Sequence, residues 1–312
     1  MIAAAVALIL AVFLIPVIKQ RNMQKRFEEQ MDLGNRYLLE QDYEAAIVAF
    51  RKAIEIDPRQ AESYRKMAEA YVGIGDYENA ILTLEKGYEY TGEESLKEYQ
   101  EEVLQMKERQ ERREAVIRGL YEACLVSDED RLYEILYSDE YRQIGNEWEL
   151  PLFYPEENGT ALGIYQKGVY FGTLADGIRE GEGRWYFPDE TVRGWRYRFT
   201  GDWVNDYPNG NGEVDQSFWN DSPGIEAEGM DHEIIRGNYR DGYADGEMSV
   251  SSTYHTGADQ WQDNYHFRAN YGVYEIIAEE GGEYVISYEN GMVSVDEPGI
   301  RNVGVRGAMK DF

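Results

Sequence analysis

Cysteine and basic residues are both scarce in this chain. Cys124 is the one cysteine among 312 residues, so no disulfide can form within the chain, which is compatible with the cytoplasm and with many envelope proteins. Lysine and arginine number 31 against 60 aspartates and glutamates, giving a formal net charge of −29 at pH 7. Nucleic-acid binding needs basic surface to displace counterions, and docking on anionic lipid needs the same. The composition therefore argues against a nucleic-acid partner and against lipid binding by the soluble part.

The chain also lacks the residue patterns of common catalytic and metal sites. Its three histidines, His232, His255 and His266, do not have the i, i+4 spacing of metal sites on helices. There is no phosphate-binding loop, and the Gly-x-Gly triplets at 181–183 and 210–212 do not open a helix. Paired carboxylates arise from composition in a chain this acidic. We therefore assign no catalytic residue, metal ligand, cofactor or small-molecule substrate, and we expect a protein that is not an enzyme.

A long apolar run covers residues 2–18 (IAAAVALILAVFLIPVI), and a basic flank begins at Lys19. Seventeen apolar residues are at the short end of the roughly 17–25 that span a bilayer. No small-residue cleavage pattern follows the run, so residues 1–19 are predicted to be a single-pass transmembrane anchor rather than a cleaved signal peptide or a buried helix. Positive charge after the run favours a cytoplasmic location for the bulk of the chain. Basic residues upstream of Met1 would reverse that orientation and make the bulk extracytoplasmic.

Residues 27–94 show helical periodicity twice, with a shift of 34 residues. Asp42 and Asp76 are predicted to cap the second helix of each unit. The pattern resembles the tetratricopeptide (TPR) repeat, whose period is 34 residues and whose unit is a helical hairpin. The first copy meets the family positions at Leu33, Gly34, Tyr37, Ala46, Phe50, Ala53 and Pro58. The second copy keeps Tyr71 and Ala80 but has Ala68, Gly87 and Gly92 where the family has glycine, alanine and proline.

Two such units are fewer than the three or so that repeat arrays need. Residues 95–144 are therefore predicted to supply capping and linker helices, namely a long charged helix over about 94–126 and a short helix with Ser127 as its N-cap. The middle of the long helix, KERQERRE, has no apolar face. Cys124 lies in an apolar stretch and is predicted to be a core thiol. We place the domain boundary near Gly145.

Residues 146–312 have strand and hairpin signals and contain all six tryptophans. One phrase of spaced glycines recurs three times, with an aromatic two residues after the first glycine in the last two copies: Gly172, Gly177, Gly181 and Gly183; Gly201, Trp203, Gly210 and Gly212; Gly237, Tyr239, Gly242 and Gly246. Asp206 and Met248 stand at two of the glycine positions. The phrase resembles the MORN repeat, which implies a row of short β-hairpins in a sheet or elongated meander. Further hairpin turns are predicted at 281–282 and 290–291.

The glycines are predicted to form turns and bulges or to leave a flat floor on which an aromatic ring of the next hairpin lies. The rings would then form a ladder of buried side chains: Tyr170, Trp185, Phe199, Trp203 and Tyr239.

The expected fold class is thus multidomain α + β, with a transmembrane helix, helical hairpins with a capping helix, and an all-β hairpin domain. Some tetratricopeptide domains clamp a partner's terminal carboxylate with basic and asparagine side chains on the first helix of each unit. Asn35 and Arg65 stand on those helices and Tyr64 lies beside them, but Met31 and Glu69 occupy positions where a clamp needs a base and a polar amide. We therefore predict a general peptide groove with Asn35, Tyr64 and Arg65 as candidate contacts.

The expected function is a non-catalytic, membrane-anchored scaffold that binds protein partners through the helical groove and the β-repeat surface. The alternative is an extracytoplasmic protein that binds cell-envelope glycan or wall polymer through exposed aromatic rings of the hairpins. The two differ in membrane topology and in the exposure of those rings.

Overall fold

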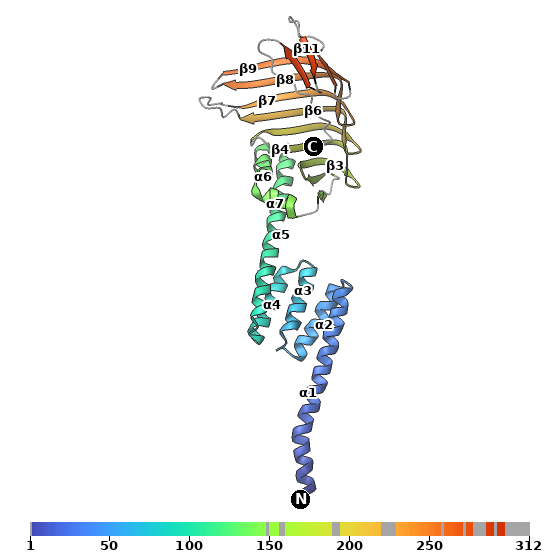
Figure 1. Cartoon of the computed structure of the whole chain (residues 1–312), viewed down its shortest axis with the longest axis vertical. Coiled ribbons are helices and arrows are strands. Elements are labelled where there is room, and N and C mark those ends of the chain that lie inside the picture. Colours follow the sequence, from blue (N-terminus) through green and yellow to red (C-terminus); the bar gives the residue numbers. More distant parts are fainter. Residues whose placement is uncertain are drawn as a thin grey trace. The chain divides into compact units, whose positions relative to one another are not determined.

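The computed structural model describes residues 2–147, 150–155, 160–188, 194–219, 229–256, 259–270, 273–276, 285–289 and 292–296, with side chains described for residues 15–146 and for most of 150–269. The chain forms two compact units, Met1–Arg112 and Arg113–Phe312 (Figure 1).

The first unit is helical. It contains α1 (Ile2–Leu39), α2 (Tyr43–Ile56), α3 (Ala61–Gly73), α4 (Tyr77–Thr91) and the first part of α5 (Glu94–Val126). The predicted caps are confirmed, because the carboxylates of Asp42 and Asp76 accept hydrogen bonds from the backbone N–H groups of Ala45 and Asn79, each at 3.1 Å. At the end of α4, Gly92 has a φ of 70° and its N–H donates to the carbonyl of Tyr88, so the residue at the family's proline position ends the helix as a glycine C-cap.

Small residues let the helices of each hairpin approach closely. Ala46 and Ala80 are fully buried, and a Cβ on Gly34 would lie 2.5 Å from the ring of Phe50. Two apolar clusters result, one around Phe50 between α1, α2 and α3, and one around Leu84 between α3, α4 and α5. The second cluster includes Leu96 and Val103, so the first part of α5 covers the second repeat as the predicted capping helix.

The predicted anchor and the first repeat helix belong to one element, since α1 runs from Ile2 to Leu39 without a break. The side chains of residues 1–14, most of the predicted anchor, lie outside the described residues. Within the part of the chain that the structure describes, no helix has both the length and the apolar character needed to cross a bilayer.

The second unit contains an antiparallel sheet of ten strands in chain order. The strands are β1 (Leu152–Pro155), β2 (Thr160–Tyr165), β3 (Gly168–Ala175), β4 (Ile178–Pro188), β5 (Arg196–Val204), β6 (Tyr207–Trp219), β7 (Met230–Arg240), β8 (Tyr243–Thr256), β9 (Asp259–Asn270) and β10 (Val273–Ile276). A separate hairpin pairs β11 (Val285–Glu289) with β12 (Met292–Asp296). The hairpin turns predicted at 281–282 and 290–291 lie outside the described residues.

The glycine phrase marks one geometry repeated in three hairpins. Its first and last positions pair across the strands in a continuous row: Gly172 with Gly183, Gly183 with Gly201, Gly201 with Gly212, Gly212 with Gly237, and Gly237 with Met248. A register shift follows the first glycine of each phrase, after Gly172, Gly201 and Gly237. The three copies therefore occupy equivalent surroundings, as the sequence predicts.

The turns of these hairpins are equivalent as well. Their central pairs are 176–177, 205–206 and 241–242, and both residues of each pair have positive φ, as two-residue type I′ turns require. Asp206, at a glycine position of the phrase, adopts a φ of 71°. The second and third turns also bond to the preceding hairpin, because Asp206 N donates to the carbonyl of Arg179 and Gly242 N to that of Pro208.

Aromatic rings pack along one face of the glycine row. Tyr170 lies edge-on to Trp203 of the next hairpin, with centroids 5.2 Å apart, and Phe199 lies edge-on to Tyr239 at 5.1 Å. A Cβ on Gly183 would lie 2.2 Å from the hydroxyl of Tyr170. The ring over this glycine therefore comes from its own hairpin and not, as predicted, from the next hairpin. The buried ring ladder itself is present.

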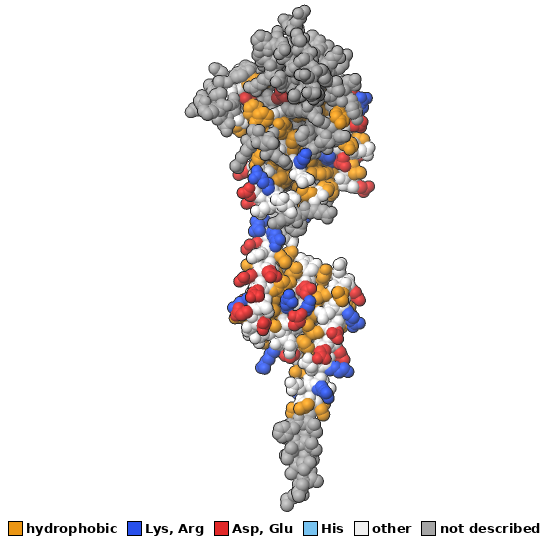
Figure 2. Space-filling model, in the orientation of Figure 1, with side chains coloured by type: hydrophobic (Ala, Val, Ile, Leu, Met, Phe, Trp, Pro, Cys, Tyr) orange, Lys and Arg blue, Asp and Glu red, His pale blue; other side chains and the backbone are white. Residues whose placement is uncertain are grey.

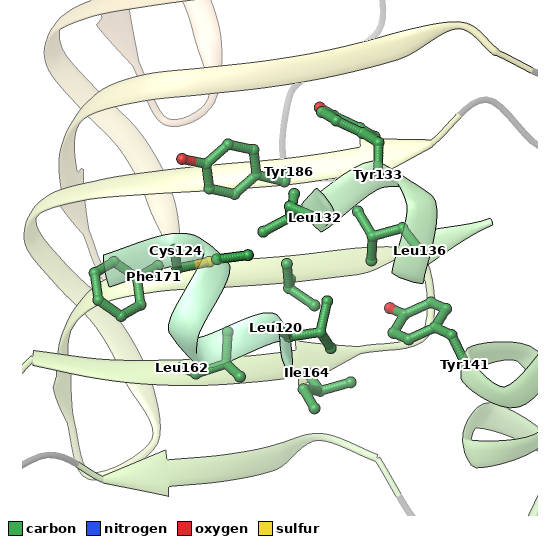
Figure 3. Packing of buried hydrophobic residues seen from close by; sticks show 12 residues of the cluster. Leu120, Cys124, Leu132, Tyr133, Leu136, Tyr141, Leu162, Ile164, Phe171 and Tyr186 are labelled. Atoms are coloured by element: carbon green, nitrogen blue, oxygen red, sulfur yellow. The ribbon is translucent and has the colours of Figure 1, made fainter. Parts of the chain in front are cut away.

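Helices cover the other face of β2–β4. The last turns of α5, together with α6 (Glu129–Leu136) and α7 (Asp139–Glu147), bury Leu120, Cys124 and Leu132 against strand residues such as Leu162 and Phe171 (Figure 3). The division of the chain between Arg112 and Arg113 thus differs from the boundary near Gly145, because these helices join the sheet. It falls inside KERQERRE, the stretch without an apolar face.

The N-cap of α6 is Asp128, whose carboxylate accepts from Arg131 N, rather than the predicted Ser127. Ser127 has a φ of 56°, and its hydroxyl accepts a hydrogen bond from Arg184 at 2.7 Å.

Candidate functional site: the surface of the helical repeats

The first helices of the repeats present a charged face. On α3, Glu62, Arg65 and Glu69 are exposed while Tyr64 and Ala68 are buried, because residues three or four apart share a face of a helix. The guanidinium of Arg65 lies 5.7 Å from the centre of the Tyr99 ring on α5. This contact places the exposed faces of α3 and α5 side by side.

The three predicted contact residues fall in different environments. Arg65 is exposed on α3 and Asn35 is half-buried on α1. Tyr64 is only 1% exposed, and its hydroxyl donates to the carbonyl of Pro58 at 3.1 Å. Tyr64 is therefore a core residue that ties α3 to the end of the first repeat. It faces the core while Arg65 faces solvent, because neighbouring side chains on a helix point about 100° apart. Asn35 and Arg65 remain predictions.

Carboxylates dominate this face. Glu62 and Glu69 on α3 and Glu98 and Glu102 on α5 are exposed, and Lys66 is already paired with Glu69 at 2.8 Å. Burial, and then the charge of Glu69, raises the pKa of the half-buried Tyr99 hydroxyl. Figure 2 shows acidic, basic and apolar side chains interspersed over the helical unit. Tyr99 and Glu102 were not among the predicted contacts, although their place on a capping helix next to α3 was a signal for them.

Reactive groups elsewhere are sequestered or paired. Cys124 is buried, and burial raises the pKa of its thiol to about 12, so it is not a nucleophile near neutral pH. His232 Nδ1 lies 3.0 Å from the Asp215 carboxylate, and Asp215 also pairs with Arg198 at 3.2 Å. Among the described residues, no group of three or more histidine, cysteine or carboxylate side chains is placed to hold a metal ion.

A cavity of about 460 Å³ lies where α6 and α7 meet the end of β2. Its lining includes Leu136, Tyr141 and Ile164 with Arg142 and Lys167. Arg142 pairs with Asp139 at 3.2 Å, and the hydroxyl of Tyr141 donates to the carbonyl of Tyr165 at 3.3 Å. The first contact lies within α7 and the second holds α7 on β2, so we assign the cavity no chemistry.

The rings required by the glycan-binding alternative are mostly internal. Trp185 and Trp203 are each 1% exposed and Tyr239 is 4% exposed. Trp219 is half exposed at 50%, and its strand neighbour Phe218 stacks on Trp195. The described ring ladder is thus a core rather than a stacking platform.

Comparison with known proteins supports the helical repeats. Family models described as "TPR repeat" and "Tetratricopeptide repeat" match residues 34–75 and 61–93. Tetratricopeptide repeat protein 16 of Mus musculus is 29% identical over 65 residues, which is 21% of this chain but only 8% of that protein. The chain thus spans a small part of the relative it matches. The matched residues are the same ones that form the helical hairpins and their caps. We conclude that the helical unit of this chain carries tetratricopeptide repeats.

Proposed function

We propose that this protein is a non-catalytic scaffold whose helical repeats bind a protein partner through the exposed faces of α1, α3 and α5. The observation that carries the proposal is the pair of tetratricopeptide repeats, whose first helices leave charged side chains in solvent instead of packing against the rest of the unit. Repeat stacks of this kind present extended surfaces for binding.

The proposed partner segment is basic. Four exposed carboxylates, Glu62 and Glu69 on α3 and Glu98 and Glu102 on α5, lie on the helices that carry Arg65 and Tyr99, and the chain as a whole carries −29. Complementary charge raises association rates and suppresses wrong partners. A terminal-carboxylate clamp fits this face poorly, because Met31 is buried at 9% exposure and Glu69 is acidic.

Charge reversal on two faces of the repeats tests the proposal. Glu69→Lys with Glu102→Lys is expected to lower capture of the partner at least tenfold, while Glu85→Lys with Glu89→Lys on α4 leaves it within twofold. Both pairs change the net charge equally, and all four residues are exposed. An equal loss of partner capture in the two variants would indicate nonspecific charge attraction. Full capture by the first variant would refute binding at the face formed by α3 and α5.

The hairpin sheet is proposed as a second docking face built from MORN-like units. The support is that the glycines have the same spacing in all three copies of the phrase. Each copy also has the same turn, the same register shift after its first glycine and the same place in the glycine row.

Membrane attachment through residues 1–19 is the remaining part of the proposal. The apolar run of the sequence supports it, as does the exposure of Ile15, Val17 and Ile18 at 61%, 59% and 56% on α1, since exposed apolar clusters mark interaction sites. The full chain is expected to stay with membranes at alkaline pH, and Leu8→Arg with Val12→Arg to release it. Release of the unchanged chain would refute the anchor. If the unchanged chain stays with the membranes, protease accessibility on intact cells reports on which side the soluble units lie.

A further inference from the structure

A buried arginine lies among aromatic rings at the junction of the first two glycine hairpins. The side chain of Arg179 is 8% exposed. Its guanidinium carbon lies 5.0 Å from the ring centre of Tyr165, 4.9 Å from that of Trp185 and 4.6 Å from that of Trp203. Aromatic faces stabilise a cation at such distances.

Three hydrogen-bond donors of this cluster have no acceptor. They are Nη1 of Arg179, Nε1 of Trp185 and the hydroxyl of Tyr165, each buried and without a hydrogen-bond partner among the residues that the structure describes. The ring centres of Tyr165 and Trp185 are 5.2 Å apart, and the guanidinium carbon of Arg179 lies within 5.0 Å of both, so the three side chains belong to one cluster. Burial raises the pKa of the Tyr165 hydroxyl to about 12, which keeps its proton in place.

Neighbouring polar groups of the same cluster are satisfied. Trp203 Nε1 donates to the carbonyl of Gly183, and the Tyr170 hydroxyl donates to that of Thr173 at 3.2 Å. Arg179 Nε donates to the carboxylate of Asp206 at 3.1 Å. Because buried polar groups are almost always paired, three unpaired donors in one place indicate an acceptor supplied from outside the fold.

The charge of the region favours an anion. Asp206, the ion-pair partner of Arg179, is 40% exposed, so solvent screens its charge while the guanidinium remains inside. A small anion can accept hydrogen bonds from several donors and brings no hydrogen of its own, whereas a water molecule must also place its two hydrogens.

We propose that Arg179, Trp185 and Tyr165 form a binding site for a small monovalent anion, either a halide or the carboxylate of a ligand. The site lies in the hairpin sheet, and it is independent of partner binding by the helical repeats.

Thermal unfolding of the full chain, followed by tryptophan fluorescence, tests the site. At constant ionic strength, replacing sulfate by chloride or by formate is expected to raise Tm by about 2–4 °C at saturation. A response to formate alone indicates a carboxylate ligand, and one to chloride alone indicates a halide. A Tm independent of the anion would overturn the proposal.

Two tyrosines provide a matched pair of variants. Tyr165→Phe is expected to abolish the anion-dependent shift, as is Trp185→Phe, which removes the indole N–H. Tyr170→Phe removes a hydroxyl that already has an acceptor, so it is expected to keep the shift even if its Tm is lower in every buffer. Retention of the full shift by Tyr165→Phe and Trp185→Phe would show that the anion binds elsewhere and would refute the site.

Discussion

Single residues decide how closely the strands of the hairpin sheet can approach the side chains above them. The glycine row is the clearest case, because each position lies against a ring, a thioether or a neighbouring backbone. The repeated spacing predicted equivalent glycines, and the structure bears this out. The sequence could not show what each glycine touches, since Tyr170 reaches Gly183 only through the pairing of β3 with β4.

Replacement of Gly201 by alanine should destabilise the second unit by about 1–3 kcal/mol. The added Cβ would lie 2.5 Å from the carbonyl oxygen of Asn211 and 2.7 Å from Cα of Gly212, both backbone atoms that cannot move aside. Gly145 in α7 has open space around it, so Gly145→Ala should be neutral or stabilising by up to about 1 kcal/mol. Urea unfolding of the two variants measures the difference; equal stability would contradict the close packing of the row.

His232 should make the second unit less stable as pH rises. Its hydrogen bond to Asp215 raises the pKa of His232 above the ordinary 6.5, with Arg198 opposing and Glu129 assisting. Because the folded-state pKa is the higher one, the contribution is complete below about pH 6.5 and is lost as pH rises through the raised value. The difference in unfolding free energy between the wild type and His232→Gln should therefore shrink from pH 6 to pH 8. Exposed His266→Gln is the control, and a constant difference would contradict the linkage.

At the scale of elements, the sequence predicted those helices and hairpins that depend on residues close together in the chain. Such elements were readable from three local features, namely the 34-residue shift, the caps at Asp42 and Asp76, and the Asp-Gly turns. Each of these features acts between residues near one another in the chain. Contacts between segments far apart in the chain could not be predicted from the sequence. The burial of Leu132 and Leu162 in one cluster and the continuity of α1 are examples.

Residues 146–312 were predicted to be hairpins throughout, but the continuation of the glycine row into the outer strands was not predicted, for a related reason. Ala161 on β2 and Phe267 on β9 continue the glycine row by their pairing with Gly172 and Met248, but neither residue is a glycine. A motif search for spaced glycines therefore ends at β8, while the sheet continues through β10.

The two units should respond separately to core truncation. All six tryptophans lie in the second unit, so their fluorescence reports its unfolding, while helical circular dichroism reports mainly the first. Phe50→Ala should cost about 3–5 kcal/mol and Leu132→Ala about 2–5 kcal/mol, since both side chains are almost fully buried. Phe50→Ala should shift the dichroism transition and leave fluorescence unchanged, and Leu132→Ala the reverse. A shift of both signals by both variants would mean that the units unfold together.

At the scale of the whole molecule, the chain combines a helical-repeat unit with a hairpin-repeat unit. Both are built from recurring modules whose small residues let neighbours pack closely, such as Ala46 and Ala80 in the helices and the glycine row in the sheet. The described residues show interior aromatics and paired charges rather than a convergent reactive site. This arrangement is consistent with the proposed binding role of the acidic face around Arg65.

Hydrogen–deuterium exchange of the full chain with its captured partner tests the binding face most directly. We predict slower exchange on binding in peptides from residues 27–39, 61–73 and 94–106, which belong to α1, α3 and α5. Protection confined to 152–276, with the first helices unaffected, would contradict the scaffold account in its central point.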